Sequence, residues 1–141
     1  AAQRALELGV QWIKERVAFG KPIAKYQGIQ FELADLWAEL EALRSLVYRA
    51  AWMNDEKYKN ERFTPREVTK YIAAAKLKAT KFAFRVFEKV LLWTGAWGYT
   101  KDCPLEMGLR GVMSYYIGAE GTVNIQRLII ARELLGREYI D

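Results

Sequence analysis

The most constraining feature of this 141-residue sequence is an interval without glycine, from Gly28 to Gly95, which contains a single proline, Pro65. Glycine and proline interrupt regular secondary structure more than other residues, so such an interval is typical of long helices. Apolar residues also recur at alternating steps of three and four, as one face of a helix requires. These periodic stretches are Leu6 to Val17, Ile29 to Ala50 and Val68 to Val86. Because no stretch shows the alternation of a strand, the sequence predicts an all-α fold.

The expected helix ends carry capping residues. Thr64, Pro65 and Glu67 combine an N-cap hydroxyl, a proline at the first helical position and a glutamate that can close a capping box. A helix should therefore begin here, after a charged, solvated connection over residues 54–63. A loop over 95–104, a short helix over 105–116, a break over 117–121 and a last helix over about 122–135, with Gly136 as its C-cap, complete the prediction. Together they predict an antiparallel helical bundle of the four-helix type, with long helices plus a short one.

The composition excludes several classes of catalytic site. The chain has no histidine and one cysteine, Cys103, so an internal disulfide, a multi-cysteine zinc site and a His-dependent nucleophile are ruled out. Proton transfer must fall to a carboxylate, a lysine, a tyrosine or the cysteine, and we interpret Cys103 as a small buried hydrophobe. The net charge of +5 mildly favours anionic partners. A basic stripe, interpreted as a solvated face rather than a nucleic-acid site, comprises Lys78, Lys81, Arg85 and Lys89.

Length and hydropathy indicate one domain over residues 1–141, without a targeting signal. The longest apolar stretches fall far short of the roughly 18 residues that span a bilayer. We therefore expect a soluble, cytoplasmic protein without membrane partners. An amphipathic pattern is already in progress at Ala1, which suggests a helix truncated at its start and a fragment of a longer protein.

Four motifs follow one another along the chain. They are Arg16-Val-Ala-Phe19-Gly20-Lys-Pro22-Ile23 with Gln27, Leu33-Ala-Asp35 with Glu41-Ala-Leu-Arg44, Gly95-Ala-Trp-Gly98-Tyr99 reaching Arg110, and Glu120-Gly121-Thr122 with Ile125-Gln126-Arg127. Each motif alone is weak, but their shared order and spacing resemble the C-terminal helical domain of the acyl-CoA dehydrogenases over nearly the whole chain. The resemblance implies an FAD enzyme that removes hydrogens from the α and β carbons of an acyl-CoA thioester. It also implies that an N-terminal helical domain and a middle β domain are absent here.

The resemblance implies that Glu120 is the base that takes the α-proton of the thioester. Because that proton is far too weakly acidic for an ordinary carboxylate, the site is expected to polarise the carbonyl and to raise the carboxylate's pKa by burial. From the neighbouring residues alone a second interpretation stays open, in which Glu120 only favours the positive end of the next helix. Gly121 is expected to lie against the substrate, and Thr122 and Asn124 to contact the flavin nucleotide.

A second set of positions is expected, by the same resemblance, to contact FAD of a neighbouring subunit: Arg16, Phe19, Gln27, Leu92, Gly95 and Ala96. The guanidinium fork of Arg16 suits phosphate oxygens, although an ordinary solvated arginine is the alternative. Phe19 fits a core anchor equally well. Leu92 stands where the family usually has glutamine, and Ala96 where it has a second glycine. These departures remove an amide contact and add a methyl group near the cofactor.

The preferred function is therefore the C-terminal domain of an FAD-dependent acyl-CoA dehydrogenase, inactive when isolated. A homo-oligomer, either dimer or tetramer, and an acceptor of the electron-transfer flavoprotein type are the implied partners, with no metal and no nucleic acid. The alternatives are an acyl-CoA oxidase-like flavoenzyme of the same fold and a non-enzymatic helical interaction module. A basic nucleic-acid binder is the least favoured.

Overall fold

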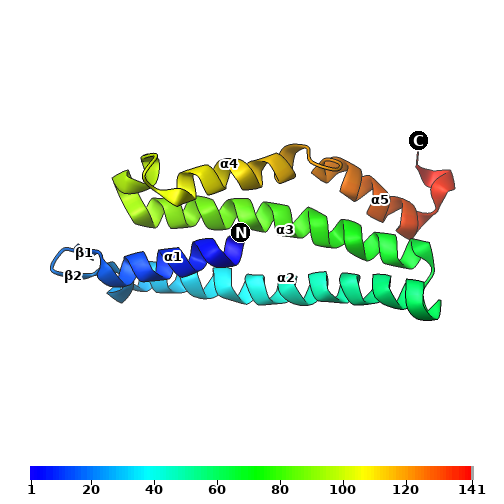
Figure 1. Cartoon of the computed structure of the whole chain (residues 1–141), viewed down its shortest axis with the longest axis horizontal. Coiled ribbons are helices and arrows are strands. Elements are labelled where there is room, and N and C mark those ends of the chain that lie inside the picture. Colours follow the sequence, from blue (N-terminus) through cyan, green and yellow to red (C-terminus); the bar gives the residue numbers. More distant parts are fainter. Residues whose placement is uncertain (141) are drawn as a thin grey trace. The chain divides into compact units, whose positions relative to one another are not determined.

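The computed structural model describes residues 1–140 and is almost entirely helical (Figure 1). Its α-helices are α1 (Ala2–Glu15), α2 (Gln27–Asn60), α3 (Pro65–Thr94), α4 (Pro104–Ile117) and α5 (Val123–Leu135). Short 3-10 turns are η1 (Ile23–Lys25), η2 (Gly95–Tyr99) and η3 (Arg137–Tyr139), and two-residue strands are β1 (Val17–Ala18) and β2 (Lys21–Pro22). The all-α prediction is confirmed. None of the helices within this described part has the length and apolar character that a membrane span requires.

The chain divides into two compact units. Unit 1 comprises Ala1–Leu40 and Phe82–Ser114, and unit 2 comprises Glu41–Lys81 and the residues from Tyr115 onward. The expectation of a single domain over 1–141 stays a prediction.

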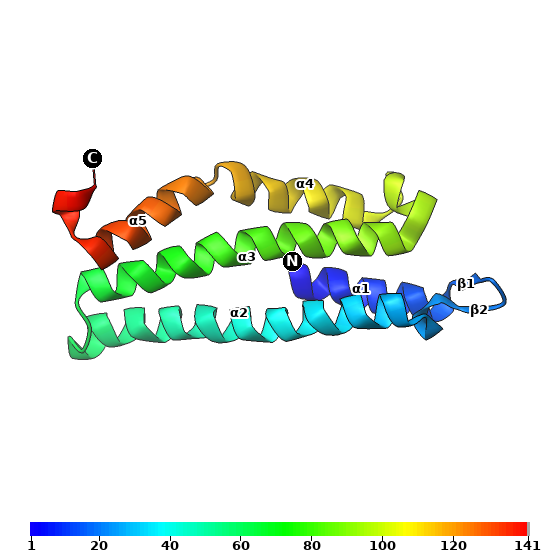
Figure 2. The ribbon, with the colours of Figure 1, turned by 180° about the vertical axis from the view of Figure 1, so that it is seen from behind.

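Unit 1 is built around close packing of α1 on the second half of α3. In both views α1 lies beside the first part of α2 and the last part of α3 (Figures 1 and 2). Gly9 permits the approach, because a Cβ placed on it would lie 2.8 Å from Cγ1 of Val90. Cys103 is fully buried in this unit, as expected for a small hydrophobe. The core side chains are Ala5, Leu6, Ile13, Leu36, Phe82, Val86, Phe87, Val90, Trp93, Cys103, Leu105 and Val112.

In unit 2, α3 begins with the predicted capping box. The backbone N–H of Thr64 donates to Oε2 of Glu67 at 2.8 Å, and the N–H of Glu67 donates to Oγ1 of Thr64 at 3.3 Å. The predicted connection over 54–63 is wrong in its first part, because α2 continues to Asn60. Charged and polar side chains one turn apart stabilise this extension, as in the contacts that Lys59 makes with Asp55 and Asn60 with Glu56. The buried apolar residues are Leu43, Ala50, Met53, Val68, Ala73 and Ala75.

A small hairpin corrects the expectation that the chain has no strands. Val17 pairs with Pro22 and Ala18 with Lys21 across a two-residue turn. The turn residues, Phe19 at φ 51° and Gly20 at φ 81°, both have the positive φ that a type I′ turn demands. Strands of two residues are too short to produce an alternating pattern, which is why periodicity could not reveal them.

The basic stripe of α3 is partly neutralised within unit 1. Arg85 pairs with Glu39, and Lys89 pairs with Glu32 at 2.6 Å. Arg85 stays exposed and Lys89 is half-buried, so this face remains in contact with solvent, while α2 supplies carboxylates opposite these two cations.

Candidate functional site

The turn between α4 and α5 holds Glu120 in a left-handed backbone conformation. Its φ is 55°, and that of Gly121 is 95°. A non-glycine residue in this region costs of order 1–3 kcal/mol and persists only where its surroundings enforce it. Glu61, at the end of α2, shares this conformation, so backbone strain alone does not mark a base.

Contacts on both sides of Glu120 fix the turn within unit 2. The ammonium group of Lys76, on α3, donates to the carbonyl oxygen of Ala119. On the other side, Nε2 of Gln126, on α5, donates to the carbonyl oxygen of Gly121 at 3.4 Å. The N–H of Gly121 also donates to the carbonyl of Gly118 at 3.2 Å. Both carbonyls that flank Glu120 are therefore bound by side chains of other elements.

The carboxylate of Glu120 is exposed in this chain. Within residues 1–140, no hydrogen bond or ion pair holds it. The expectation of a buried acid is wrong for the chain by itself, because the apolar neighbours that suggested burial are themselves exposed: Tyr115 is 59% accessible and Ile117 62%.

The start of α5 presents the remaining residues of this turn. Thr122 is confirmed as the N-cap, since its hydroxyl oxygen accepts a hydrogen bond from the N–H of Ile125 at 3.3 Å. Asn124 is exposed, and its Oδ1 accepts from Nη1 of Arg127 at 2.5 Å. Position 121 favours glycine for two reasons. Its φ is positive, and a Cβ there would lie only 3.1 Å from Nε2 of Gln126. The helix N-terminus beside Glu120 therefore offers free N–H groups to an anion.

The second set of sequence-derived positions lies in unit 1 and is exposed throughout: Arg16, Phe19, Gln27, Leu92, Gly95 and Ala96. A stack between Trp12 and Trp97, with ring centroids 4.7 Å apart, joins the last turn of α1 to η2. The hairpin and η2 therefore lie at the same end of this unit, as Figures 1 and 2 show. Phe19 is 97% exposed, so its interpretation as a core anchor is wrong.

A polar cluster of Glu32, Lys89 and Trp93, which we call the polar clamp, lies next to the start of η2 and was not predicted from the sequence. The carboxylate of Glu32 accepts hydrogen bonds from Nζ of Lys89 at 2.6 Å and from Nε1 of Trp93 at 3.0 Å. The Lys89 contact, followed by that of Trp93, lowers the pKa of Glu32 from its ordinary value. Trp93 is buried, which makes it a core residue of unit 1. The clamp thus fixes the last turn of α3, directly before Gly95.

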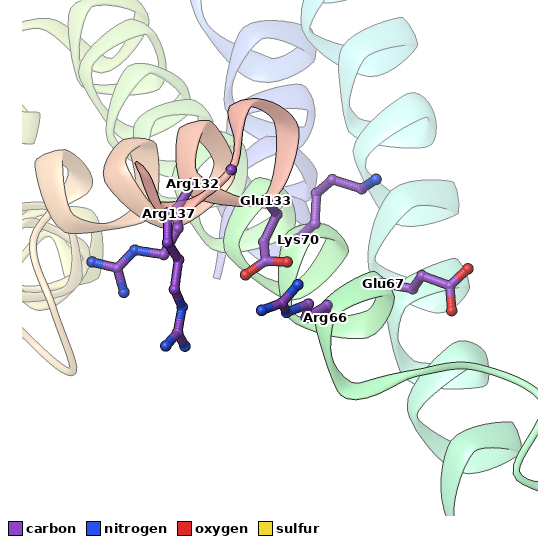
Figure 3. Close-up of a pocket in the computed structure, with 7 residues that line it drawn as sticks. Arg66, Glu67, Lys70, Arg132, Glu133 and Arg137 are labelled. Atoms are coloured by element: carbon purple, nitrogen blue, oxygen red, sulfur yellow. The ribbon is translucent and has the colours of Figure 1, made fainter. Parts of the chain in front are cut away.

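Unit 2 also contains a basic cavity of about 180 Å³, between the start of α3 and the end of α5 (Figure 3). Its charged lining residues are Arg66, Glu67, Lys70, Arg132, Glu133 and Arg137. Figure 3 shows the guanidinium group of Arg66 beside the carboxylate of Glu133 and the side chains of Arg132 and Arg137 on the other side of Glu133, while Lys70 and Glu67 point away. Hydrogen bonds from Thr64 hold Glu67 and lower its pKa.

The four cations of this cavity are available to a ligand. Within the described residues, none of their side chains makes a hydrogen bond or ion pair. Two lie one turn apart at the start of α3, and the other two flank Gly136 at the end of α5. The only sign of this cavity in the sequence was the pair of cations near each of two helix ends. Only the fold brings the two pairs together, and the result suits a phosphate or carboxylate group.

Comparison with known proteins gives a consistent result. A family model described as "Acyl-CoA dehydrogenase, C-terminal domain" matches residues 1–135. The probable acyl-CoA dehydrogenase YngJ of Bacillus subtilis (strain 168) is 42% identical over 134 residues, which cover 95% of this chain and 33% of that protein.

Solved structures agree with the sequence matches. The butyryl-CoA dehydrogenase of Megasphaera elsdenii superposes with a TM-score of 0.82 at 34% identity, covering 95% of this chain and 33% of that one. The FAD complex of PigA gives a TM-score of 0.81 at 28% identity, covering 94% and 32%. The chain thus spans about a third of the length of these proteins.

Proposed function

This chain belongs to the acyl-CoA dehydrogenase C-terminal domain family, and on that premise we propose that it forms part of an FAD-dependent acyl-CoA dehydrogenase. The observation that carries the proposal is the position of Glu120. It lies just before the N-terminus of α5, in a left-handed backbone conformation. The carbonyls of the residues before and after it, Ala119 and Gly121, both accept hydrogen bonds from side chains. A base that must meet one C–H bond at a defined angle needs such restraint.

Glu120 removes the α-proton of the bound thioester in this account. Gly121 would lie against the substrate, where it presents no side chain; its positive φ and the nearness of Gln126 also favour glycine at this position. The rest of the polypeptide and the acyl chain exclude water from Glu120, which raises the free energy of its charged form and strengthens it as a base. FAD, when bound, supplies the acceptor for the hydride that leaves the β-carbon.

The residues present fit a flavin nucleotide. The N-terminus of α5, with Thr122 and Asn124, offers N–H groups and polar side chains to an anionic or hydroxylated group. In unit 1, the exposed guanidinium of Arg16 and the exposed ring of Phe19 could hold a phosphate and an aromatic ring, respectively. The structure of PigA, with which this chain superposes, is an FAD complex.

The basic cavity of unit 2 supports coenzyme A as the carrier of the acyl group. The 13 residues of α5 separate the Glu120 turn from this cavity, a helix length of about 20 Å. The extended pantetheine arm of CoA covers such a distance. With the thioester at Glu120, the phosphates would reach Arg66 and Arg132, whose guanidinium groups suit them.

The two sets of cofactor positions support a homo-oligomer. Following the family resemblance, we assign Thr122 and Asn124 to the flavin of their own subunit, and the exposed positions of unit 1, Arg16 among them, to the flavin of a neighbouring subunit. Exposed aromatic residues on α2, among them Trp37 and Tyr48 at 61% and 65%, supply apolar surface for a dimer or tetramer. An electron-transfer flavoprotein is the proposed acceptor.

The test is to express the whole polypeptide that contains this chain, load it with FAD and add acyl-CoA thioesters anaerobically. Bleaching of the flavin with formation of the 2-enoyl-CoA is the expected result, whereas residues 1–141 alone should be inactive. Absence of flavin binding and of any reaction with a range of acyl-CoA chain lengths would leave a helical interaction module instead. Rapid reoxidation of the reduced flavin by oxygen would identify an oxidase.

A further inference from the structure

Two side chains from separate helices bind the carbonyls on either side of Glu120. Lys76 is partly buried on α3 and reaches the carbonyl of Ala119, 43 residues further along the chain. Gln126 is 6% exposed, and its amide reaches the carbonyl of Gly121. No motif in the sequence marks Lys76, and its neighbour Lys78 on the same helix is exposed.

These contacts have a specific mechanical effect. Ala119 lies just beyond the C-terminus of α4, where free carbonyls accept hydrogen bonds from lysine and favour its positive charge. Glu120, between the two bound carbonyls, would relax from a φ of 55° if either were released, because the left-handed conformation is unfavourable for a side chain with a Cβ. Release would rotate its Cα–Cβ bond and swing the carboxylate away from its present direction.

We propose that Lys76 is a positioning residue for the base, and that Gln126 serves the same purpose from the opposite side. This inference rests on the proposed function of Glu120. Lys76 touches neither substrate nor flavin in this account. It acts through the backbone of Ala119, and its loss changes the approach of the carboxylate to the α-proton rather than the binding of the thioester.

The experiment compares four variants of the FAD-loaded enzyme: K76M, K76R, Q126M and the control K78M. Stopped-flow flavin reduction gives the rate constant of the chemical step and the substrate dissociation constant separately. Exchange of the substrate's α-deuterium into water reports the base alone. Backbone amide exchange at Gly121 reports the turn without any catalysis.

K76M is expected to slow both flavin reduction and α-deuterium exchange by about 10- to 100-fold, since a displacement of about 1 Å costs that much. Its substrate dissociation constant and flavin content should match those of K78M. Amide exchange at Gly121 should accelerate in K76M but not in K78M. K76R, which keeps a donor, should recover most of the rate, and Q126M should reproduce the K76M pattern.

The proposal is overturned if K76M and Q126M both react as fast as K78M, or if K76M loses only substrate affinity. If K76M fails to bind FAD, the outcome for Q126M and K76R decides by the same criteria. The variant E120Q distinguishes a failure of the proposed function of Glu120 from a failure of the positioning role of Lys76. If E120Q retains full rate, the proposed function fails. If E120Q is inactive while K76M equals K78M, only the positioning role fails.

Discussion

Glu32 and Lys89 meet between α2 and α3 of unit 1, with Nζ of Lys89 2.6 Å from Oε1 of the carboxylate. The second oxygen accepts from Nε1 of Trp93 at 3.0 Å. One carboxylate thus satisfies a cation and the indole of a core tryptophan at the helix end that leads into Gly95. Both charged side chains remain more than a third exposed, so solvent screens the pair.

The first prediction concerns pH and stability. Because its contacts lower the pKa of Glu32, their contribution is complete above about pH 4.3 and is lost as the pH falls through the lowered pKa. E32Q should therefore reduce the free energy of unfolding by up to about 1 kcal/mol at pH 7. The difference from wild type should shrink below pH 4. Urea denaturation at pH 7 and pH 3.5 measures it, with E88Q on the exposed side of α3 as the control. An equal loss in both variants would contradict the prediction.

Two glycines of α4 should respond oppositely to alanine. A Cβ on Gly108 would lie 2.3 Å from Cε1 of the buried Phe87, whereas one on Gly111 would meet nothing within 4 Å. G108A should destabilise unit 1 by about 1–3 kcal/mol through overpacking. G111A should stabilise the chain by up to about 1 kcal/mol, because alanine favours helix. Thermal and urea denaturation of both variants test this. Equal signs for the two changes would show that the contact with Phe87 is not as described.

The hairpin predicts a conflict between stability and cofactor binding at Phe19. Asparagine is favoured over phenylalanine at the first position of a type I′ turn, and the ring of Phe19 is 97% exposed. F19N should therefore leave the unfolding transition unchanged or raise it slightly. It should weaken FAD binding by the enzyme, because the exposed ring is a proposed cofactor contact. Denaturation and flavin titration measure the two effects separately, and unchanged flavin affinity would remove Phe19 from the site.

The basic cavity predicts a substrate-dependent effect. R66Q and R132Q should each raise the KM for acyl-CoA by roughly tenfold, the loss expected for a charge-assisted hydrogen bond. The KM for the matching acyl-N-acetylcysteamine thioester, which lacks the phosphates, should not change. K78Q, from the exposed face of α3, is the control. Equal effects on both substrates would place the phosphates elsewhere.

Local sequence signals were sufficient for much of the fold. Glycine spacing and apolar periodicity predicted the long helices, and the capping residues Thr64 and Thr122 located two of their starts. Those signals depend on neighbouring residues, and propensity and capping act at that range. The hairpin depends instead on two turn residues, one of which, Phe19, is unusual there.

The parts that could not be predicted arise from contacts between distant residues. The basic cavity forms where Arg66 and Arg132 meet in the fold, and the bond from Lys76 to Ala119 spans 43 residues. Glu120 was wrongly predicted to be buried, because apolar residues next to it along the chain need not cover its side chain in space. Periodicity carries no information about either kind of contact.

The central claim, that Glu120 is the base, is tested most directly by single-turnover flavin reduction in E120Q. The matched control is E61Q, since Glu61 is also an exposed glutamate with positive φ. E120Q should bind FAD and acyl-CoA normally but reduce the flavin about 10²- to 10⁴-fold more slowly, while E61Q reacts like wild type. Reduction of the flavin by E120Q at the rate of E61Q would contradict the account.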